Sequence, residues 1–494
     1  SDRPMTRCND PLSFGSVRVA ADQPNNAIPN PESSILAAAR LSGKNHTNTA
    51  PAVGGLFFPQ SKSLGIDRSG HSLAQQAKIV YAGSNNTSYE QGDADLKKLA
   101  EMTKVGAKQV RRVCKHIGAE RCIERDEAVT QYQALPLVER KQTPKGVTTP
   151  KVAVIGVDGG RLQIFDRAAT ATPVTNSPPT PDSTSTDDHP DERADNGRHW
   201  REDKIGLLMT MRSEVQAVDP CPEIPANFVN PLRIMKLARE LKKRVPVGEE
   251  AAKPATEADE QSDSETSEEW DRPEVESKRF VATRRVWEEF GPMVATRAWE
   301  WGFFGSSRRA FIGDGASNNW TMWRGYFSSF TPILDFIHAL SYVFASATAG
   351  RPFAEGWSCY VRWIEWVWQG DVEKVVAELV LRQEELGVPA KDESACSPRQ
   401  VVARALEYLR NNVSRMKYAE YRRDGLPLTS SYVESAVKQF NYRVKGTEKF
   451  WDEVGAEEML QLRADFLSDD QPLDDFWKRR EANESGQRRY RKTA

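Results

Sequence analysis

The sequence has few cysteines and histidines, and none is arranged as a known metal or disulfide pattern. Its six cysteines stand at positions 8, 114, 122, 221, 359 and 396, and no two of them have the CxxC spacing. None of its six histidines belongs to an HExxH or a C2H2 pattern. These absences argue against a zinc knuckle and a disulfide framework, and they favour a reducing, intracellular compartment.

Long hydrophobic runs are also missing. No apolar stretch approaches the ~20 residues that span a bilayer, and residues 1–23 have no apolar core of the kind found in signal peptides. We therefore expect a soluble cytoplasmic protein, associated with the nucleoid, that has no membrane partner.

The chain lacks a net charge of one sign, since 68 basic and 70 acidic residues give a formal charge of -2. The charge is uneven, however. Acidic residues gather at 182–195 and 249–276, whereas the end of the chain, FWKRREANESGQRRYRKTA, is basic. We expect disordered acidic loops at 170–195 and 248–276, a flexible segment at 1–60, and a mobile basic tail at 471–494 that touches nucleic acid.

Three acidic residues stand in settings that point to a shared site. Asp158 ends the run VAVIGVD and Asp314 ends AFIGD, and both runs have the composition of short buried strands. Glu434 lies in the amphipathic run SSYVESAVKQFNYRVKG, which predicts a helix. Carboxylates gathered at a sheet edge repel one another unless a cation shares the site, and hard oxygen ligands suit Mg²⁺ or Mn²⁺. Two such ions ~3.5–4 Å apart can activate an attacking oxygen and stabilise a leaving one.

Each acid also has a structural interpretation when it is taken alone. Asp158, Gly159 and Gly160 would make a good hairpin turn, since Asp-Gly is a turn former. Glu434 would be an ordinary helix residue that pairs with Lys438. The functional interpretation depends on the combination of the three.

Two segments, RRAFIGDGASNNWTMWRGYFSSFTPILDFIHALSYVFASA and GLPLTSSYVESAVKQFNYRVKGTEKFWDEVGAEEMLQLRA, resemble the catalytic region of DDE transposases of bacterial insertion sequences, most closely the Kra type. The similarity covers residues 64 to 469, and KIVYAG and HWREDKIG belong to it. In that family the first acid follows a strand, the second lies in a GDG motif followed by Trp, and the third is a helical Glu followed by basic and amide residues. The matching positions in this chain are Asp158, Asp314 with Trp320, and Glu434 with Lys438, Asn441, Arg443 and Lys445.

The resemblance implies the fold and the chemistry. It implies an α/β protein whose RNase H-like mixed sheet is flanked by helices, with an N-terminal helical DNA-binding region and a helical insertion before the third acid. The three acids would be catalytic and would hold two Mg²⁺ or Mn²⁺ ions. The partners would be double-stranded DNA, as element ends and target, and further copies of the chain, because two ends must be brought together.

Asp335 and His338 are further candidates. The run ILDFIHALSY predicts a helix with these two residues three apart on one face. The resemblance implies an Asp or Cys and a His at this spacing, so His338 would reach the scissile phosphate or a metal ligand and Asp335 would orient it. A satisfied structural pair is the competing interpretation.

Upstream, DADLKKLAEMTKVGAKQVRRVCKHIGAE predicts two short helices joined by a turn at residues 103–106. Leu96, Leu99, Val110, Val113 and Ile117 would form their inner faces. The second helix and the turn carry basic residues that would contact DNA, as in a helix-turn-helix: Lys104, Lys108, Arg111, Arg112 and Lys115. A two-helix piece of a larger helical domain remains the alternative.

These patterns predict a domain order. A DNA-binding region at 61–145 precedes the first part of the core at 146–346, which is followed by the helical insertion at 347–423 and the last part of the core at 424–470. The expected activity is terminal-repeat binding, metal-dependent strand cleavage and 3'-hydroxyl strand transfer. Two alternatives stay open: a transposase-derived regulator that binds DNA without catalysis, and a metal-dependent nuclease that does not join strands.

Overall fold

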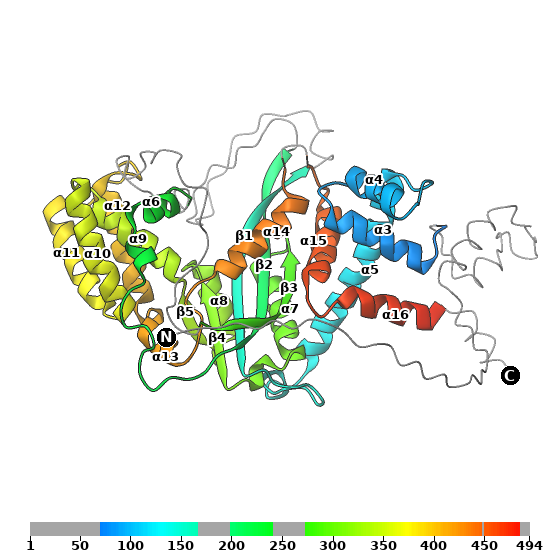
Figure 1. Ribbon diagram of the computed structural model, residues 1–494, viewed down its shortest axis with the longest axis horizontal. Coiled ribbons are helices and arrows are strands. Elements are labelled where there is room, and N and C mark those ends of the chain that lie inside the picture. Colours follow the sequence, from blue (N-terminus) through cyan, green and yellow to red (C-terminus); the bar gives the residue numbers. More distant parts are fainter. Residues whose placement is uncertain (1–69, 166–197, 241–271, 447–448, 485–494) are drawn as a thin grey trace, which may run out of the picture.

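A five-stranded sheet forms the centre of the protein (Figure 1). The computed structural model describes residues 70–165, 198–240, 272–446 and 449–484. The strands are β1 (Val152–Phe165), β2 (Arg198–Arg212), β3 (Glu274–Thr283), β4 (Arg308–Gly313) and β5 (Thr331–Leu334), and their order in the sheet is β3-β2-β1-β4-β5. β2 is antiparallel to β1 and β3, whereas β4 is parallel to β1 and β5. The fold is therefore mixed α/β, as predicted.

Helices cover both faces of this sheet, and two glycines show how closely they approach. On one face lies α14 (Ser431–Val444), and a Cβ placed on Gly156 of β1 would come within 2.3 Å of Val433. On the other face lies α7 (Trp287–Glu300), and a Cβ on Gly206 of β2 would come within 2.9 Å of Val294. Because paired residues of antiparallel strands point to the same face, these contacts assign a face to every residue of β1 and β2.

A helical lobe packs beside β5 and stands on the left of Figure 1. It comprises α9 (Phe336–Thr348), α10 (Phe353–Gln369), α11 (Val372–Leu386), α12 (Pro398–Asn412) and α13 (Tyr418–Arg423), with α6 (Pro231–Glu240) against α9. Trp363 and Trp368 of α10 are buried, and Arg422 lies over the Trp368 ring at 4.1 Å. These tryptophans thus form the core of the lobe.

The N-terminal helices pack against the C-terminal ones at the other end of the sheet (Figure 1). They are α3 (Leu73–Asn85), α4 (Tyr89–Leu99) and α5 (Ala107–Ala134). α3 and α5 pack against α15 (Glu453–Leu467), α3 also contacts α16 (Pro472–Glu484), and α4 packs against α3 and α5. The remaining helix, α8 (Ser317–Tyr326), follows β4 and contacts α7. Within the described ranges, no helix is both long enough and apolar enough to cross a membrane.

Several expectations from the sequence are corrected. Asp158 does not end its strand, because β1 runs without a break through Gly159 and Gly160 to Phe165. The hairpin alternative fails for the same reason. β3 begins at Glu274, inside the acidic segment expected to be a loop, and the four-residue β5 was not predicted.

The helical predictions at both ends also change. α5 has 28 residues rather than being short, and Leu99 is 78% exposed instead of lying on an inner face. Residues 472–484 of the expected mobile tail form α16, whose Phe476 is buried. The segments 1–60, 170–195 and 248–271 and the tail residues 485–494 lie outside the described residues.

Candidate active site

Asp158 and Asp314 stand at equivalent positions of neighbouring parallel strands. The last paired residues of β1 and β4 are Gly156 and Ile312. Asp158 lies two residues further along β1, and Asp314 lies two residues further along the chain, just after the end of β4. Adjacent strands are ~4.8 Å apart, so the backbones of the two acids are close neighbours at this edge. Both residues are half-buried.

The side chain of Asp158 points to the face that α14 covers. Side chains alternate along a strand, so Asp158 shares a face with Gly156, which is in contact with Val433. Val433 directly precedes Glu434 in the first turn of α14. Glu434 is half-buried. The structure therefore brings the third acid over the strand that carries the first.

Asp314 is held by the start of the next helix. Its Oδ1 accepts hydrogen bonds from the backbone N–H of Ala316 at 3.0 Å and from Nδ2 of Asn319 at 2.8 Å. Its backbone carbonyl accepts one from the Tyr408 hydroxyl at 2.7 Å, which ties the loop to α12 of the helical lobe. One carboxylate oxygen is thus fixed by the fold.

Asp335 joins the start of α9 to the start of the helix that carries Glu434. Its Oδ1 accepts from the backbone N–H of Ile337 at 2.6 Å, and its Oδ2 accepts from the backbone N–H of Ser430 at 2.6 Å and from the Ser430 hydroxyl. Ser430 is the residue that precedes α14. Burial opposes the charge of Asp335, but His338 and Ser430 outweigh it and lower the pKa of the carboxyl group. Asp335 therefore positions the Glu434 helix.

The expected roles of Asp335 and His338 at a phosphate do not match this placement. Asp335 is the N-cap of α9 and not a residue of its face, because its side chain accepts from the first turn of the helix. Asp335 is 1% exposed and His338 is 3% exposed, with Nδ1 of His338 3.7 Å from Oδ1 of Asp335. Both side chains are buried, and Asp335 connects the start of α9 to the start of α14.

The residues of α14 expected to bind DNA divide into two groups. Lys438 is exposed and Asn441 is half-buried, and together with Glu434 their spacing places them along one side of α14. Lys445 is exposed just after the end of the helix, as its C-cap residue. Arg443 is only 2% exposed and donates to the Gly83 carbonyl at 2.8 Å, so it joins α14 to α3. Arg443 is therefore not on the surface.

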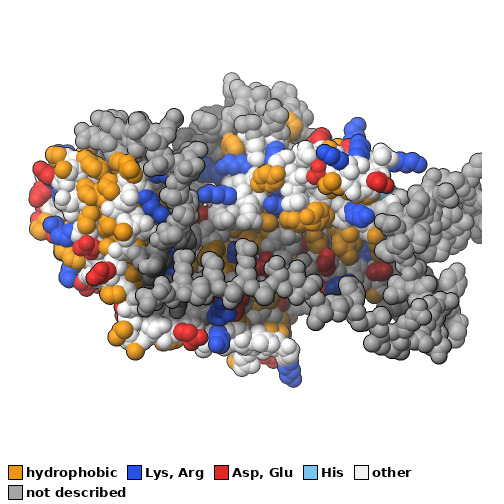
Figure 2. Space-filling view, viewed as in Figure 1, with side chains coloured by type: hydrophobic (Ala, Val, Ile, Leu, Met, Phe, Trp, Pro, Cys, Tyr) orange, Lys and Arg blue, Asp and Glu red, His pale blue; other side chains and the backbone are white. Residues whose placement is uncertain are grey.

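Trp320 is also buried, at 4% exposure, and Arg415 lies 4.4 Å from the centre of its ring. Its expected contact with DNA is thus contradicted by its position in the core. Figure 2 shows Lys and Arg side chains over the upper middle and right of the molecule, where α14, α3 and α4 lie, interspersed with hydrophobic ones.

A fourth acid on the same face was not singled out from the sequence. Asp203 of β2 pairs with Gly160, and its carboxylate oxygens lie 2.8 and 2.9 Å from where a Cβ of Gly160 would be. The residue is fully buried, and neither oxygen accepts a hydrogen bond from another residue. Burial raises the pKa of Asp203 to about 6, although its own backbone N–H and the charges of Lys445 and Lys204 lower it. Nothing in the charged run REDK distinguishes this acid in the sequence, and only the strand register reveals it.

The donor chemistry of this region suits a hard divalent cation, since carboxylate oxygens are the ligands that Mg²⁺ prefers. The unpartnered oxygens of Asp203 are an additional reason to expect a cation there. In the part of the chain that the structure describes, however, no three His, Cys, Asp or Glu side chains are close enough together to hold a metal ion. A cation would require adjustment of these side chains.

The expected DNA-binding helix is α5, and the basic residues expected to contact DNA lie in its first part and in the turn before it. Lys104, Lys108 and Arg112 are exposed. Nζ of Lys115 lies 3.1 Å from Asp452, and Arg111 lies 3.6 Å from the same carboxylate. These two cations therefore stabilise the contact with α15, which begins just after Asp452.

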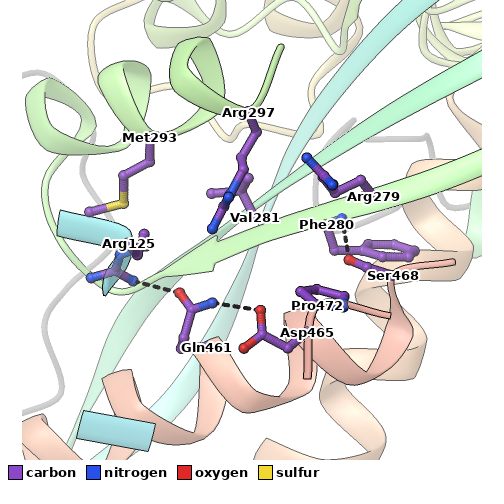
Figure 3. Close-up of a pocket in the computed structure, with 10 residues that line it drawn as sticks. All are labelled: Arg125, Arg279, Phe280, Val281, Met293, Arg297, Gln461, Asp465, Ser468 and Pro472. Atoms are coloured by element: carbon purple, nitrogen blue, oxygen red, sulfur yellow. Dashed lines mark hydrogen bonds between the residues drawn. The ribbon is translucent and has the colours of Figure 1, made fainter. Parts of the chain in front are cut away.

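The middle of α5 is embedded in a buried ionic network, where Arg121 pairs with Asp465 at 2.7 Å and Arg125 with Glu457 at 2.9 Å. Figure 3 shows Arg125 from α5, Arg279 from β3 and Arg297 from α7 converging on a small cavity above Gln461 and Asp465 of α15. Burial, together with Arg297, lowers the pKa of Arg279 to about 9. With a volume of about 20 Å³ the cavity has room for about one water molecule, so it is not a substrate site.

Comparison of the chain with protein-family models and with curated proteins gave no match.

Proposed function

We propose that the protein is a DNA transposase that cleaves DNA strands at the ends of its element and joins the freed 3'-hydroxyl groups to target DNA. The main support is the register that places Asp158 beside Asp314, with the helix of Glu434 packed over the same strand. Three acids separated by long stretches of sequence thus come from one sheet edge and one covering helix. The proposal also includes an RNase H-like identity for the mixed sheet.

In this proposal Asp158, Asp314 and Glu434 would hold two Mg²⁺ or Mn²⁺ ions, which would supply the activation of an attacking oxygen and the stabilisation of a leaving one. The chain's own residues bind and orient the DNA. Lys438 lies exposed on the same helix as Glu434, and Lys445 lies exposed just after its end; both would contact phosphates of the strand being cut. Asp335 and His338 hold the Glu434 helix in place from below.

The N-terminal helices would recognise the element ends. Lys104, Lys108 and Arg112 are exposed around the turn before α5 and its first part, where they could reach DNA phosphates. The embedded middle of α5, with Arg121 and Arg125, would fix this surface relative to the sheet. A synaptic complex of several copies would then bring two ends together.

Labelled duplexes that tile the DNA flanking the protein's own gene test this proposal. Incubated with Mg²⁺, the wild-type chain should give site-specific nicks and joined products on a denaturing gel. Asp314→Asn is the matched control, because an amide oxygen can still accept from Ala316 while the negative charge is lost. Binding without cleavage by the wild type would favour a DNA-binding regulator, and nicks without joined products would favour a nuclease.

A further inference from the structure

Asp203 has no structural role that explains its burial as a carboxylate. It is fully buried on β2, and neither of its oxygens accepts a hydrogen bond from another residue. A buried carboxylate without partners is strongly unfavourable unless a cation or a proton compensates it. The nearby Lys445 and Lys204 attract the Asp203 carboxylate through their charge, but neither donates a hydrogen bond to it.

Asp203 lies next to the first acid of the site. Asp158 pairs with Ile205 and Gly160 pairs with Asp203, so Asp203 and Asp158 are diagonal neighbours on the face that α14 covers. Diagonal neighbours of antiparallel strands have Cα atoms ~7–8 Å apart, a separation that two carboxylates can bridge through a shared cation.

The space for this carboxylate depends on a glycine. A Cβ on Gly160 would be 2.8 Å from one oxygen of Asp203 and 2.9 Å from the other. Any larger residue at position 160 would displace the carboxylate. The glycine of the Asp-Gly-Gly sequence thus keeps Asp203 in place beside Asp158, although no turn is formed there.

We propose that Asp203 is a fourth carboxylate of the site and binds, together with Asp158, a divalent cation of the Mg²⁺ class. This inference about Asp203 rests on the proposed function in one respect only, which is that Asp158 is a metal ligand. Cation binding itself does not require DNA cleavage, so the two can be tested separately.

Calorimetric titration of the full-length chain with Mn²⁺, without DNA, tests the role of Asp203. Wild type should bind Mn²⁺, and Asp203→Asn should weaken this binding by about 10–100-fold. Gly160→Ala keeps every acidic residue, and it should also weaken Mn²⁺ binding. Glu202→Gln is the matched control, since this neighbour on β2 points to the opposite face and pairs with Lys204 at 3.0 Å. Glu202 acts on Asp203 only through its charge, so the Mn²⁺ affinity of this variant should change far less than that of Asp203→Asn.

The outcomes separate the two proposals. Unchanged Mn²⁺ affinity in both Asp203→Asn and Gly160→Ala, with loss of binding in Asp158→Asn, would refute the role of Asp203 and leave the proposed function standing. Absence of Mn²⁺ binding by wild type would also refute the role of Asp203 as a cation ligand. Equal loss in Glu202→Gln would show a general charge effect and would likewise overturn the proposal. Melting curves of the variants confirm that each is folded.

Discussion

At the scale of single residues, the most informative side chain is the buried Asp335. Asp335 uses both of its oxygens to connect Ile337 of α9 with Ser430 at the start of α14. The backbone adds a parallel link, because the N–H of Phe336 donates to the Leu428 carbonyl at 3.0 Å. The direction of the Glu434 helix is thus fixed by buried hydrogen bonds beneath the acid.

Replacement of Asp335 by Ala should lower the free energy of unfolding by about 2–4 kcal/mol, since it leaves two helix starts without their acceptor. Asp335→Asn should cost less, because its amide oxygen can still accept from Ile337. Urea unfolding curves of the two variants measure the difference. Equal stability of Asp335→Ala and wild type would disprove the positioning role.

The sequence predicted the secondary structure that carries the three acids better than the burial of the residues around them. The Val- and Ile-rich composition around Asp158 and Asp314 was enough to predict strands, because buried strands need that composition. Trp320 and Arg443 were expected to contact DNA but are buried in the structure. The local sequence does not predict this burial. An Arg that packs over an aromatic ring and an Arg that contacts DNA can have similar neighbours in the sequence.

At the scale of secondary-structure elements, the contact between α14 and β1 decides whether Glu434 reaches the other acids. Gly156→Ala would place a methyl group 2.3 Å from Val433 and push the helix away from the strand. We expect lower stability, by about 1–3 kcal/mol for an overpacked contact, and reduced strand cleavage. Adding Val433→Ala should recover much of both losses, because it removes the colliding methyl groups.

A double-mutant cycle of Gly156→Ala and Val433→Ala, read by thermal unfolding, quantifies this coupling. The interaction energy should be clearly non-zero. If the two substitutions changed the free energy of unfolding additively, Val433 of α14 would not be in direct contact with Gly156 of β1.

The interface of α5 and α15 should make stability depend on pH. Glu458 is buried against Gly118, and burial raises the pKa of its carboxyl group to about 7, with Lys115 lowering it and Asp452 raising it. A raised folded-state pKa means that the contribution of Glu458 is fully present below its ordinary pKa of 4.5 and is lost as the pH rises through 7.

Glu458→Gln should therefore stabilise the protein at pH 8, by roughly 1–2 kcal/mol, and have little effect at pH 5. Melting temperatures at the two pH values provide the measurement. Glu453→Gln, an exposed position of the same helix, is the control and should show no such difference. A Glu458→Gln gain that is equal at both pH values would contradict the account.

Two strands were missed for identifiable reasons. β3 has the sequence EVESKRFVAT, whose first half is charged and continues an acidic segment, so its composition resembled a loop. β5 has four residues and includes Pro332, which is tolerated because β5 is an edge strand of the sheet. Both strands are recognised only through pairing with distant neighbours, which no local pattern contains.

At the scale of the whole molecule, the sheet lies between a helical lobe and a bundle of terminal helices (Figure 1). The chain's charge is nearly balanced, so attraction to DNA must come from local groups of basic residues. The exposed residues at the start of α5 form one such group, and the exposed lysines of α14 form another.

Lys108→Ala combined with Arg112→Ala should weaken binding to duplex DNA and should reduce the slope of log K against log salt by about 1–2. Fluorescence anisotropy over a salt series gives this slope. A matched double variant on the helical lobe, Lys391→Ala with Arg410→Ala, removes the same charge from exposed positions far along the chain. An equal change in both variants would mean that α5 has no special part in DNA binding.

The most direct test of the central claim is to measure binding and cleavage of the same gene-flanking duplex, with Mg²⁺, by wild type and by three variants: Asp158→Asn, Asp314→Asn and Glu434→Gln. If one site holds the acids of β1, β4 and α14, each variant should bind the duplex like wild type and should lose both nicked and joined products. A variant that still cuts would remove its acid from the site, and full cleavage by all three would contradict the account.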